Sequence, residues 1–140
     1  MKVKVIFTGK TTEPWIRQGV DLYVSRLKHY APFELLELPE EGILKALRDT
    51  DYVVLLDEHG ETFSSVGWAR ILERNATRLP KDWAFVIGGP YGFPEALRKR
   101  SDAMLSLSPM TFSHQLVRVV FLEQLYRAFT IIKGEPYHHE

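Results

Sequence analysis

Apolar and polar residues follow a regular pattern from the start of this chain. Residues 2–8 (KVKVIFT) alternate with a period of two, which is typical of a strand. Residues 12–14 (TEP) then supply a helix cap, an acidic first turn and a proline at the helix start. The apolar positions that follow recur every three or four residues along one helix face: Ile16, Val20, Tyr23 and Leu27. The pattern predicts a first strand–helix unit.

Strand and helix patterns continue to alternate after this unit. Strands are predicted at 33–38, 52–57, 83–87 and 103–107, and helices at 40–49, 64–78, 94–100 and 114–133. Ser64 or Ser65 caps the third helix, Ser113 caps the last, and Gly134 and Pro136 stop it. The runs 52–57 (YVVLLD) and 83–87 (WAFVI) are apolar without alternation, as in strands covered on both faces. The order predicts an α/β fold with a mostly parallel sheet and flanking helices.

Composition narrows the class of protein. The 140 residues are 45% hydrophobic, which suffices for one packed core, so we expect a single domain over residues 1–140. The chain has no cysteine, which excludes disulfides and thiolate zinc sites and fits a cytoplasmic location. No apolar run is long enough for a membrane span or a signal peptide. A formal net charge of zero argues against a dedicated polyelectrolyte binder but leaves a structured RNA substrate open.

Three loops are candidates for ligand binding, because open parallel sheets bind ligands beyond the carboxyl ends of their strands. They follow Asp57, Ile87 and Leu107. The glycine loop at 88–92 has neither dinucleotide-binding nor Walker spacing, so it is either a tight structural turn or a close approach of backbone to a ligand. Residues 107–112 combine apolar side chains, hydroxyls and a proline, which suits an adenosine-like ligand but also an ordinary connection.

The closing helix and the tail carry further candidates. The helix is apolar on more than one side, so it lies either in the core or at a subunit interface. Arg118 and Arg127 interrupt it, either as solvated or salt-bridged residues or as ligands of a phosphate, carboxylate or base. The tail 134–140 is either a frayed end or a functional element with a stacking ring and histidines. His29 and His59 show no ligand pattern, and no metal site is predicted.

Two stretches, VIGGPYGF and LSLSPMTFSHQLVRVVFLEQLYRAFTIIKGEPYHHE, closely resemble the ribosomal RNA large subunit methyltransferase H family of the SPOUT class. This resemblance covers essentially the whole chain. It implies S-adenosylmethionine-dependent methylation of N3 of a pseudouridine in 23S ribosomal RNA, a C-terminal trefoil knot and a homodimer. Two positions depart from the family pattern. Ser113 stands where proline is usual, and the segment 39–51 is shorter than in many members.

The resemblance also implies site residues. The implied cofactor contacts are Leu56, Gly88, Leu107, Ser108, Pro109, Met110, Thr111 and Phe112. Arg127 and His138 are hypothesised to flank the target base, with Tyr137 stacking or hydrogen-bonding, and the tail acting across the dimer. No metal is required, and the expected substrate is the assembled ribosome. The alternatives are a nucleotide-binding α/β protein whose glycine loop holds phosphate, and a non-catalytic dimeric ribosome-binding module.

Overall fold

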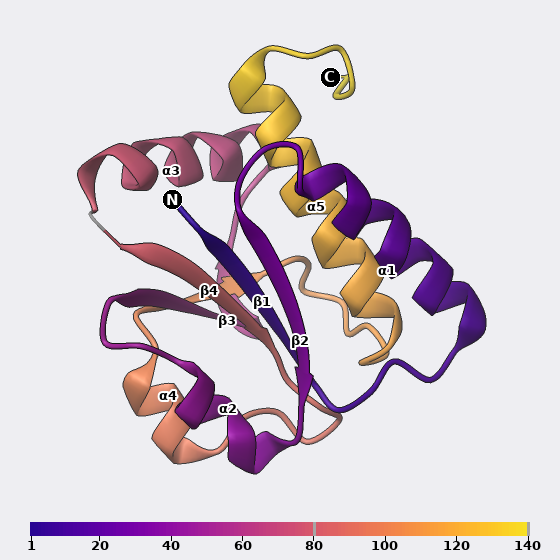
Figure 1. Ribbon diagram of the computed structural model, residues 1–140, viewed down its shortest axis with the longest axis vertical. Helices are drawn as coiled ribbons and strands as arrows, with labels where there is room; N and C mark the ends of the chain where they lie inside the picture. The colour runs from indigo at the N-terminus through magenta and orange to yellow at the C-terminus, as the bar shows by residue number, and fades with distance from the viewer. Residues whose placement is uncertain (80, 140) are drawn as a thin grey trace.

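The computed structural model describes residues 1–79 and 81–139, in which strands and helices alternate (Figure 1). The strands are β1 (Val3–Thr8), β2 (Phe33–Leu38), β3 (Asp51–Thr62), β4 (Asp82–Ile87) and β5 (Ala103–Ser106). The helices are α1 (Pro14–Leu27), α2 (Glu40–Ala46), α3 (Ser65–Arg78), α4 (Glu95–Arg100) and α5 (Leu116–Lys133). The predicted α/β class is confirmed.

The five strands form one sheet in the order β2-β1-β4-β3-β5, and all of their pairings are parallel. Helices α1, α3 and α5 cover one face, while α2 and α4 cover the other (Figure 1). All carboxyl ends of the strands therefore lie along one edge of the sheet. Within the described residues, no helix is long and apolar enough to span a membrane.

Neighbouring residues of β3 enter different cores. Val54 packs into the core below α1, α3 and α5, while Val53 and Leu55 pack into the core below α2 and α4. This double burial explains why the run YVVLLD shows no alternation. In α1 the predicted apolar stripe is confirmed, with Ile16 and Val20 completely buried.

The starts of α1 and α5 differ from the predictions. Glu13 occupies the N-cap of α1 without a side-chain cap bond, and no acidic residue lies in the first turn. The amide of Thr12 instead donates to Oε1 of Gln115 at 2.9 Å. The helix begins at Leu116 rather than at 114, although Ser113 accepts from the amide of Leu116 at 3.1 Å, as predicted for its cap. Gln115 thus holds a loop distant in sequence, a tertiary contact that local capping rules do not contain.

Other boundaries follow local hydrogen bonds. Ser64 caps α3 as predicted, accepting from the amide of Gly67 at 3.0 Å. Gly134 ends α5 with a φ of 72°, a conformation that favours glycine. Helix α2 ends at Ala46 instead of 49, because Asp51 accepts from the amide of Arg48 at 2.8 Å and forms a turn there.

Strand β3 is longer than predicted and irregular at its end. Leu105 of β5 pairs with Leu56 and again with Glu61, so the intervening residues bulge out of the ladder. A Cβ at Gly60 would lie 2.7 Å from the carbonyl carbon of Met104. The backbones of β3 and β5 therefore lie closer together at Gly60 than a residue with a side chain would allow.

Candidate functional site

A cavity of about 560 Å³ opens at the carboxyl edge of the sheet. Its walls come from the three loops that the sequence singled out. The lining residues are 56–59 in the irregular part of β3, 87–93 at and after the end of β4, and 107, 108 and 110–114 after β5, with Leu105, Arg98 and Val117. The size suits a nucleoside-sized ligand. We call this cavity the edge pocket.

The predicted cofactor residues meet in this pocket, with one exception. Those that line it are Leu56, Gly88, Leu107, Ser108, Met110, Thr111 and Phe112. Pro109 does not line the cavity and is exposed. The structure thus brings together residues from three distant segments, and their contacts with a cofactor stay a prediction.

The glycine loop forms a tight wall of the edge pocket. A Cβ on Gly88 would lie 3.1 Å from the carbonyl oxygen of Gly92 and 3.2 Å from the ring of Phe93. Gly92 adopts a φ of 80° and bridges Gly89. Of the two sequence readings, the tight turn is confirmed, and the same turn leaves backbone facing the cavity.

Two acidic residues of the edge pocket were not predicted. Asp57 accepts from Nη2 of Arg98 at 3.2 Å and from the amide of His59 at 2.8 Å. Burial raises the pKa of Asp57, but bonds from His59 and Arg98 outweigh it and hold the pKa below its ordinary value. The carboxylate of Glu58 accepts from the hydroxyl of Thr111. The acidic residues after a buried strand were a visible signal, whereas their partners were not.

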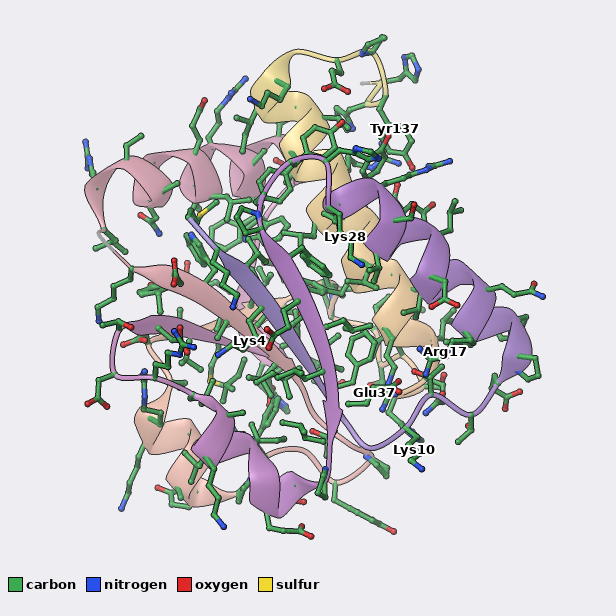
Figure 2. The ribbon with its side chains drawn as sticks, in the orientation of Figure 1. Lys4, Lys10, Arg17, Lys28, Glu37 and Tyr137 are labelled. Carbon is green, nitrogen blue, oxygen red and sulfur yellow. The ribbon has the colours of Figure 1, made fainter. Side chains whose placement is uncertain are left out.

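Arg118, at the start of α5, serves the fold. It is completely buried and donates to the carbonyl oxygen of Thr8 at 2.8 Å and to Oγ1 of Thr11 at 2.9 Å. Its guanidinium also lies 3.5 Å from Glu37, which pairs with Arg17 at 2.7 Å, and Arg17 and Glu37 lie beside each other in Figure 2. Of the sequence alternatives, Arg118 therefore has a carboxylate partner within its own chain.

The other arginine of α5 lies in a cluster with the tail. Nη2 of Arg127 donates to Glu123 at 2.6 Å, and Nη1 lies 3.1 Å from Nδ1 of His138. The hydroxyl of Tyr137 donates to Glu123 at 2.7 Å, and the Arg127 guanidinium lies 4.8 Å from the centre of its ring. We call these four residues the tail cluster. It unites the three predicted catalytic residues around Glu123, which was missed although its i,i+4 spacing to Arg127 was visible.

Charge in the tail cluster is fixed by these contacts. The hydrogen bond with Glu123 raises the pKa of Arg127 above its ordinary value, so the guanidinium stays charged. Burial, together with bonds to Glu123 and Tyr23, raises the pKa of Tyr137 far above its ordinary value. The phenol therefore remains a protonated hydrogen-bond donor near neutral pH.

The two sites lie at opposite ends of α5. Val117 lines the edge pocket, and Arg127 follows ten residues later on the same helix, a separation of about 15 Å along its axis. Figure 2 shows Tyr137 at the opposite end of α5 from Lys10, which follows β1 at the carboxyl edge. Among the described residues, no group of acidic residues and histidines could hold a metal ion.

Comparison with known proteins decides the family. Residues 1–138 match the family described as Predicted SPOUT methyltransferase. The chain belongs to this family. It is 45% identical to the Ribosomal RNA large subunit methyltransferase H of Parabacteroides distasonis, with 100% of both chains covered. It is 44% identical to that of Geobacter sulfurreducens, covering 99% of this chain and 100% of the relative. The resemblance predicted from the sequence is confirmed.

Solved structures show the same fold for this SPOUT methyltransferase. A SpoU methyltransferase from Streptomyces viridochromogenes, solved in complex with the cofactor AdoMet, matches with a TM-score of 0.54 at 15% identity. The match covers 94% of this chain and 58% of that one. A probable methylase family protein from Haemophilus influenzae matches with a TM-score of 0.57 at 12% identity, covering 99% and 70% of the two chains.

This SPOUT methyltransferase is shorter than its relatives. Its alignment with the Parabacteroides protein spans 157 positions, whereas the chain has 140 residues. The relative therefore contains residues that this chain lacks. The sequence places the shortening at 39–51, where only the short helix α2 connects β2 to β3, and this placement stays a prediction.

Proposed function

We propose that this SPOUT methyltransferase transfers the methyl group of S-adenosylmethionine to N3 of a pseudouridine in 23S ribosomal RNA. The observation that carries the proposal is full-length identity of 44–45% to enzymes named Ribosomal RNA large subunit methyltransferase H. The edge pocket supports it, because it gathers residues that the family resemblance implies as cofactor contacts.

The edge pocket fits S-adenosylmethionine in size and lining. Its volume lies within the range of ligand cavities, and it offers apolar walls at Leu56, Leu107 and Phe112. Backbone of the glycine loop and of residues 107–112 supplies the polar contacts that an adenosine requires. When bound, the cofactor supplies an activated methyl group, so the work left to the protein is positioning and deprotonation. No further cofactor is proposed.

The tail cluster provides groups for the acceptor base. N3 of a pseudouridine belongs to an imide and must lose its proton before it attacks a methyl group. Arg127 remains charged and stabilises the resulting anion, while Nδ1 of His138 lies 3.1 Å from its guanidinium. Tyr137 stays protonated and stacks on or donates to the base. These roles for Arg127, Tyr137 and His138 remain as hypothesised from the sequence.

The distance between the two sites favours a homodimer. In one chain the tail cluster lies about 15 Å along α5 from the edge pocket, so it cannot act on a base bound there. Trp15 and Leu22 of α1 are 60% and 46% exposed and, seven residues apart, share one helix face. We propose that a second copy covers such apolar surface and that its tail completes the pocket.

The remaining expectations complete the proposal. The whole chain 1–140 acts as one cytoplasmic domain whose C-terminal part forms the trefoil knot, and its substrate is the assembled ribosome. Membership of the SPOUT family supports the knot. The neutral chain supports the ribosome as substrate, because it has little charge with which to select naked RNA.

The test is transfer of labelled methyl from S-adenosylmethionine to bacterial ribosomes that lack the modification, followed by nucleoside mass analysis. A methylated pseudouridine is the expected product. Binding of S-adenosylmethionine without transfer would favour the non-catalytic ribosome-binding module. Protection of the chain by ATP but not by S-adenosylmethionine would favour the nucleotide-binding alternative.

A further inference from the structure

A second arginine borders the tail cluster, on a different helix. Arg26 lies in the last turn of α1, with its guanidinium 5.6 Å from the ring centre of Tyr23 and 5.3 Å from that of Tyr126. Tyr126 in turn packs edge-on against Tyr137, with ring centres 4.7 Å apart. One tyrosine ring therefore separates Arg26 from the proposed catalytic residues.

The two arginines differ in their partners. Arg127 has a carboxylate partner, because its guanidinium contacts both oxygens of Glu123 as well as the ring of His138. Arg26 is half-buried and, within the part of the chain that the structure describes, forms neither an ion pair nor a hydrogen bond. The guanidinium plane of Arg26 packs against aromatic rings, while its N–H groups donate to no carboxylate of the described residues.

The acidic residues nearby are already engaged. Glu123 accepts hydrogen bonds from Arg127 and Tyr137, and Glu135 accepts one from the hydroxyl of Tyr30 at 2.7 Å. Lys28, two residues after Arg26, is exposed, and Figure 2 shows it at the same end of the molecule as Tyr137. The two carboxylates therefore have other partners, and neither bonds to Arg26.

We propose that Arg26 binds a backbone phosphate of the RNA substrate, next to the nucleotide that the tail cluster positions. The fork of a guanidinium matches two phosphate oxygens, and stacking on Tyr23 and Tyr126 holds the fork in place before RNA arrives. Arg26 then fixes the register of the strand while Arg127 faces the base. This inference rests on the proposed function, since it assigns the RNA contact of that same site.

Two other roles for Arg26 predict different behaviour. A charge in the last turn of α1 stabilises the helix through its dipole, and lysine would do so equally well. An ion pair with a partner subunit would change dimer stability. A phosphate contact instead changes the affinity for RNA and its dependence on salt, and lysine replaces it only in part because it lacks the fork.

The experiment compares Arg26→Gln and Arg26→Lys with the unaltered protein in methyl transfer to ribosomes at about 50 to 200 mM salt. For Arg26→Gln we expect KM for ribosomes to rise about three- to tenfold with kcat nearly unchanged, and the log–log salt slope to become shallower by about 0.7 to 0.9. Arg26→Lys should keep the slope and recover part of the affinity. Affinity for S-adenosylmethionine should not change in either variant.

Arg70→Gln is the matched control, because Arg70 lies on α3, is 57% exposed and pairs with Glu73 at 3.2 Å. It should leave both KM and the salt slope unchanged. An unaltered KM and slope in Arg26→Gln, or a loss that appears in sedimentation as dimer dissociation, would overturn the inference while the unaltered protein still methylates. Failure of the unaltered protein to methylate ribosomes would instead overturn the proposed function.

Discussion

The two ends of α5 are built in different ways. At the start of the helix, Arg118 is completely buried and ties α5 to β1 and Glu37, while the neighbouring edge pocket is lined by residues from three separate segments of the chain. At the other end, Arg127 is partly exposed and belongs to a cluster of side chains with Glu123 and the tail. The same residue type thus has a structural role at one end and, in our proposal, a catalytic role at the other.

The difference shows what each site requires. The proposed role of the edge pocket is to hold a ligand in place, which requires a rigid wall. The proposed role of the tail cluster is to stabilise an anionic base, which requires charged and aromatic groups in a fixed orientation. Because the two sites lie at opposite ends of one helix, a single chain carries both without having them adjacent.

The largest expected effect is a loss of methyl transfer in two single variants that is recovered in their purified heterodimer. Gly88→Val fills the edge pocket, because a Cβ there already lies 3.1 Å from Gly92, and Arg127→Ala removes the charged group of the tail cluster. Each variant alone should lose at least about 100-fold in activity. A heterodimer of the two should recover about half of the unaltered activity, because one of its two sites combines an intact pocket with an intact tail.

The control is a second heterodimer, in which one chain carries both Gly88→Val and Arg127→Ala and the other chain is unaltered. If the tail acts across the dimer, each site of this heterodimer contains one defect, and methyl transfer should be absent. If pocket and tail of the same chain worked together, the result would be reversed: the control heterodimer would be active and the first one inactive.

Substitution of Gly60 tests the rigidity of the pocket end. In Gly60→Ala the new Cβ would lie 2.7 to 2.9 Å from backbone atoms of Met104 and Leu105, which cannot move aside independently. We expect a loss of about 3 kcal/mol in the free energy of unfolding, measured by urea denaturation. Gly42→Ala is the control, since its nearest neighbour is Pro39 at 3.7 Å, and its stability should be unchanged or slightly higher. Equal stability of the two variants would contradict the close approach of β3 and β5 at Gly60.

The pH dependence of stability tests the contribution of the Glu37 carboxylate. Burial raises the pKa of Glu37, but hydrogen bonds from Thr11 and Arg17 outweigh it, and the net pKa is lowered. A lowered folded pKa gives stability that is present above the unfolded value of about 4.3 and is lost as the pH falls through the folded value. Glu37→Gln should therefore cost about 2 kcal/mol of unfolding free energy at pH 7.

That difference from the unaltered protein should shrink below about pH 4.3, in urea denaturation curves recorded from pH 7 to pH 3. Glu73→Gln serves as the control, because Glu73 forms only an exposed pair with Arg70. A constant difference across this range would show that the Glu37 carboxylate charge does not contribute.

The smallest expected effect concerns the hydroxyl of Tyr137. Tyr137→Phe removes the hydrogen bond to Glu123 but keeps the ring against Tyr126 and Arg127. Methyl transfer should fall about three- to tenfold, as for loss of one hydrogen bond, while the affinity for S-adenosylmethionine stays the same. A change in cofactor affinity in calorimetry would mean that the tail also shapes the edge pocket.

Much of the fold was predictable because local patterns govern it. Strand 33–38 and the end of the last helix at Gly134 were predicted as observed, since alternation and glycine conformation are local properties. At the starts of α1 and α5, Pro14 and the bond from the amide of Leu116 to Ser113 were predicted, whereas the bonds of Gln115 to residues 10 and 12 were not, because these residues are distant in sequence. Pro109 was expected in the edge pocket and does not line it.

The sequence by itself determined the α/β class, the three ligand loops at the carboxyl edge and the family, since each depends on periodicity or on residues in a fixed order. Only the tertiary structure decided the roles of side chains. It pairs Asp57 with Arg98 and gathers Arg127, Tyr137 and His138 around Glu123. Apart from the i,i+4 pair of Glu123 and Arg127, these contacts join segments that only the folded chain brings together, so the spacing of residues along the chain does not predict them.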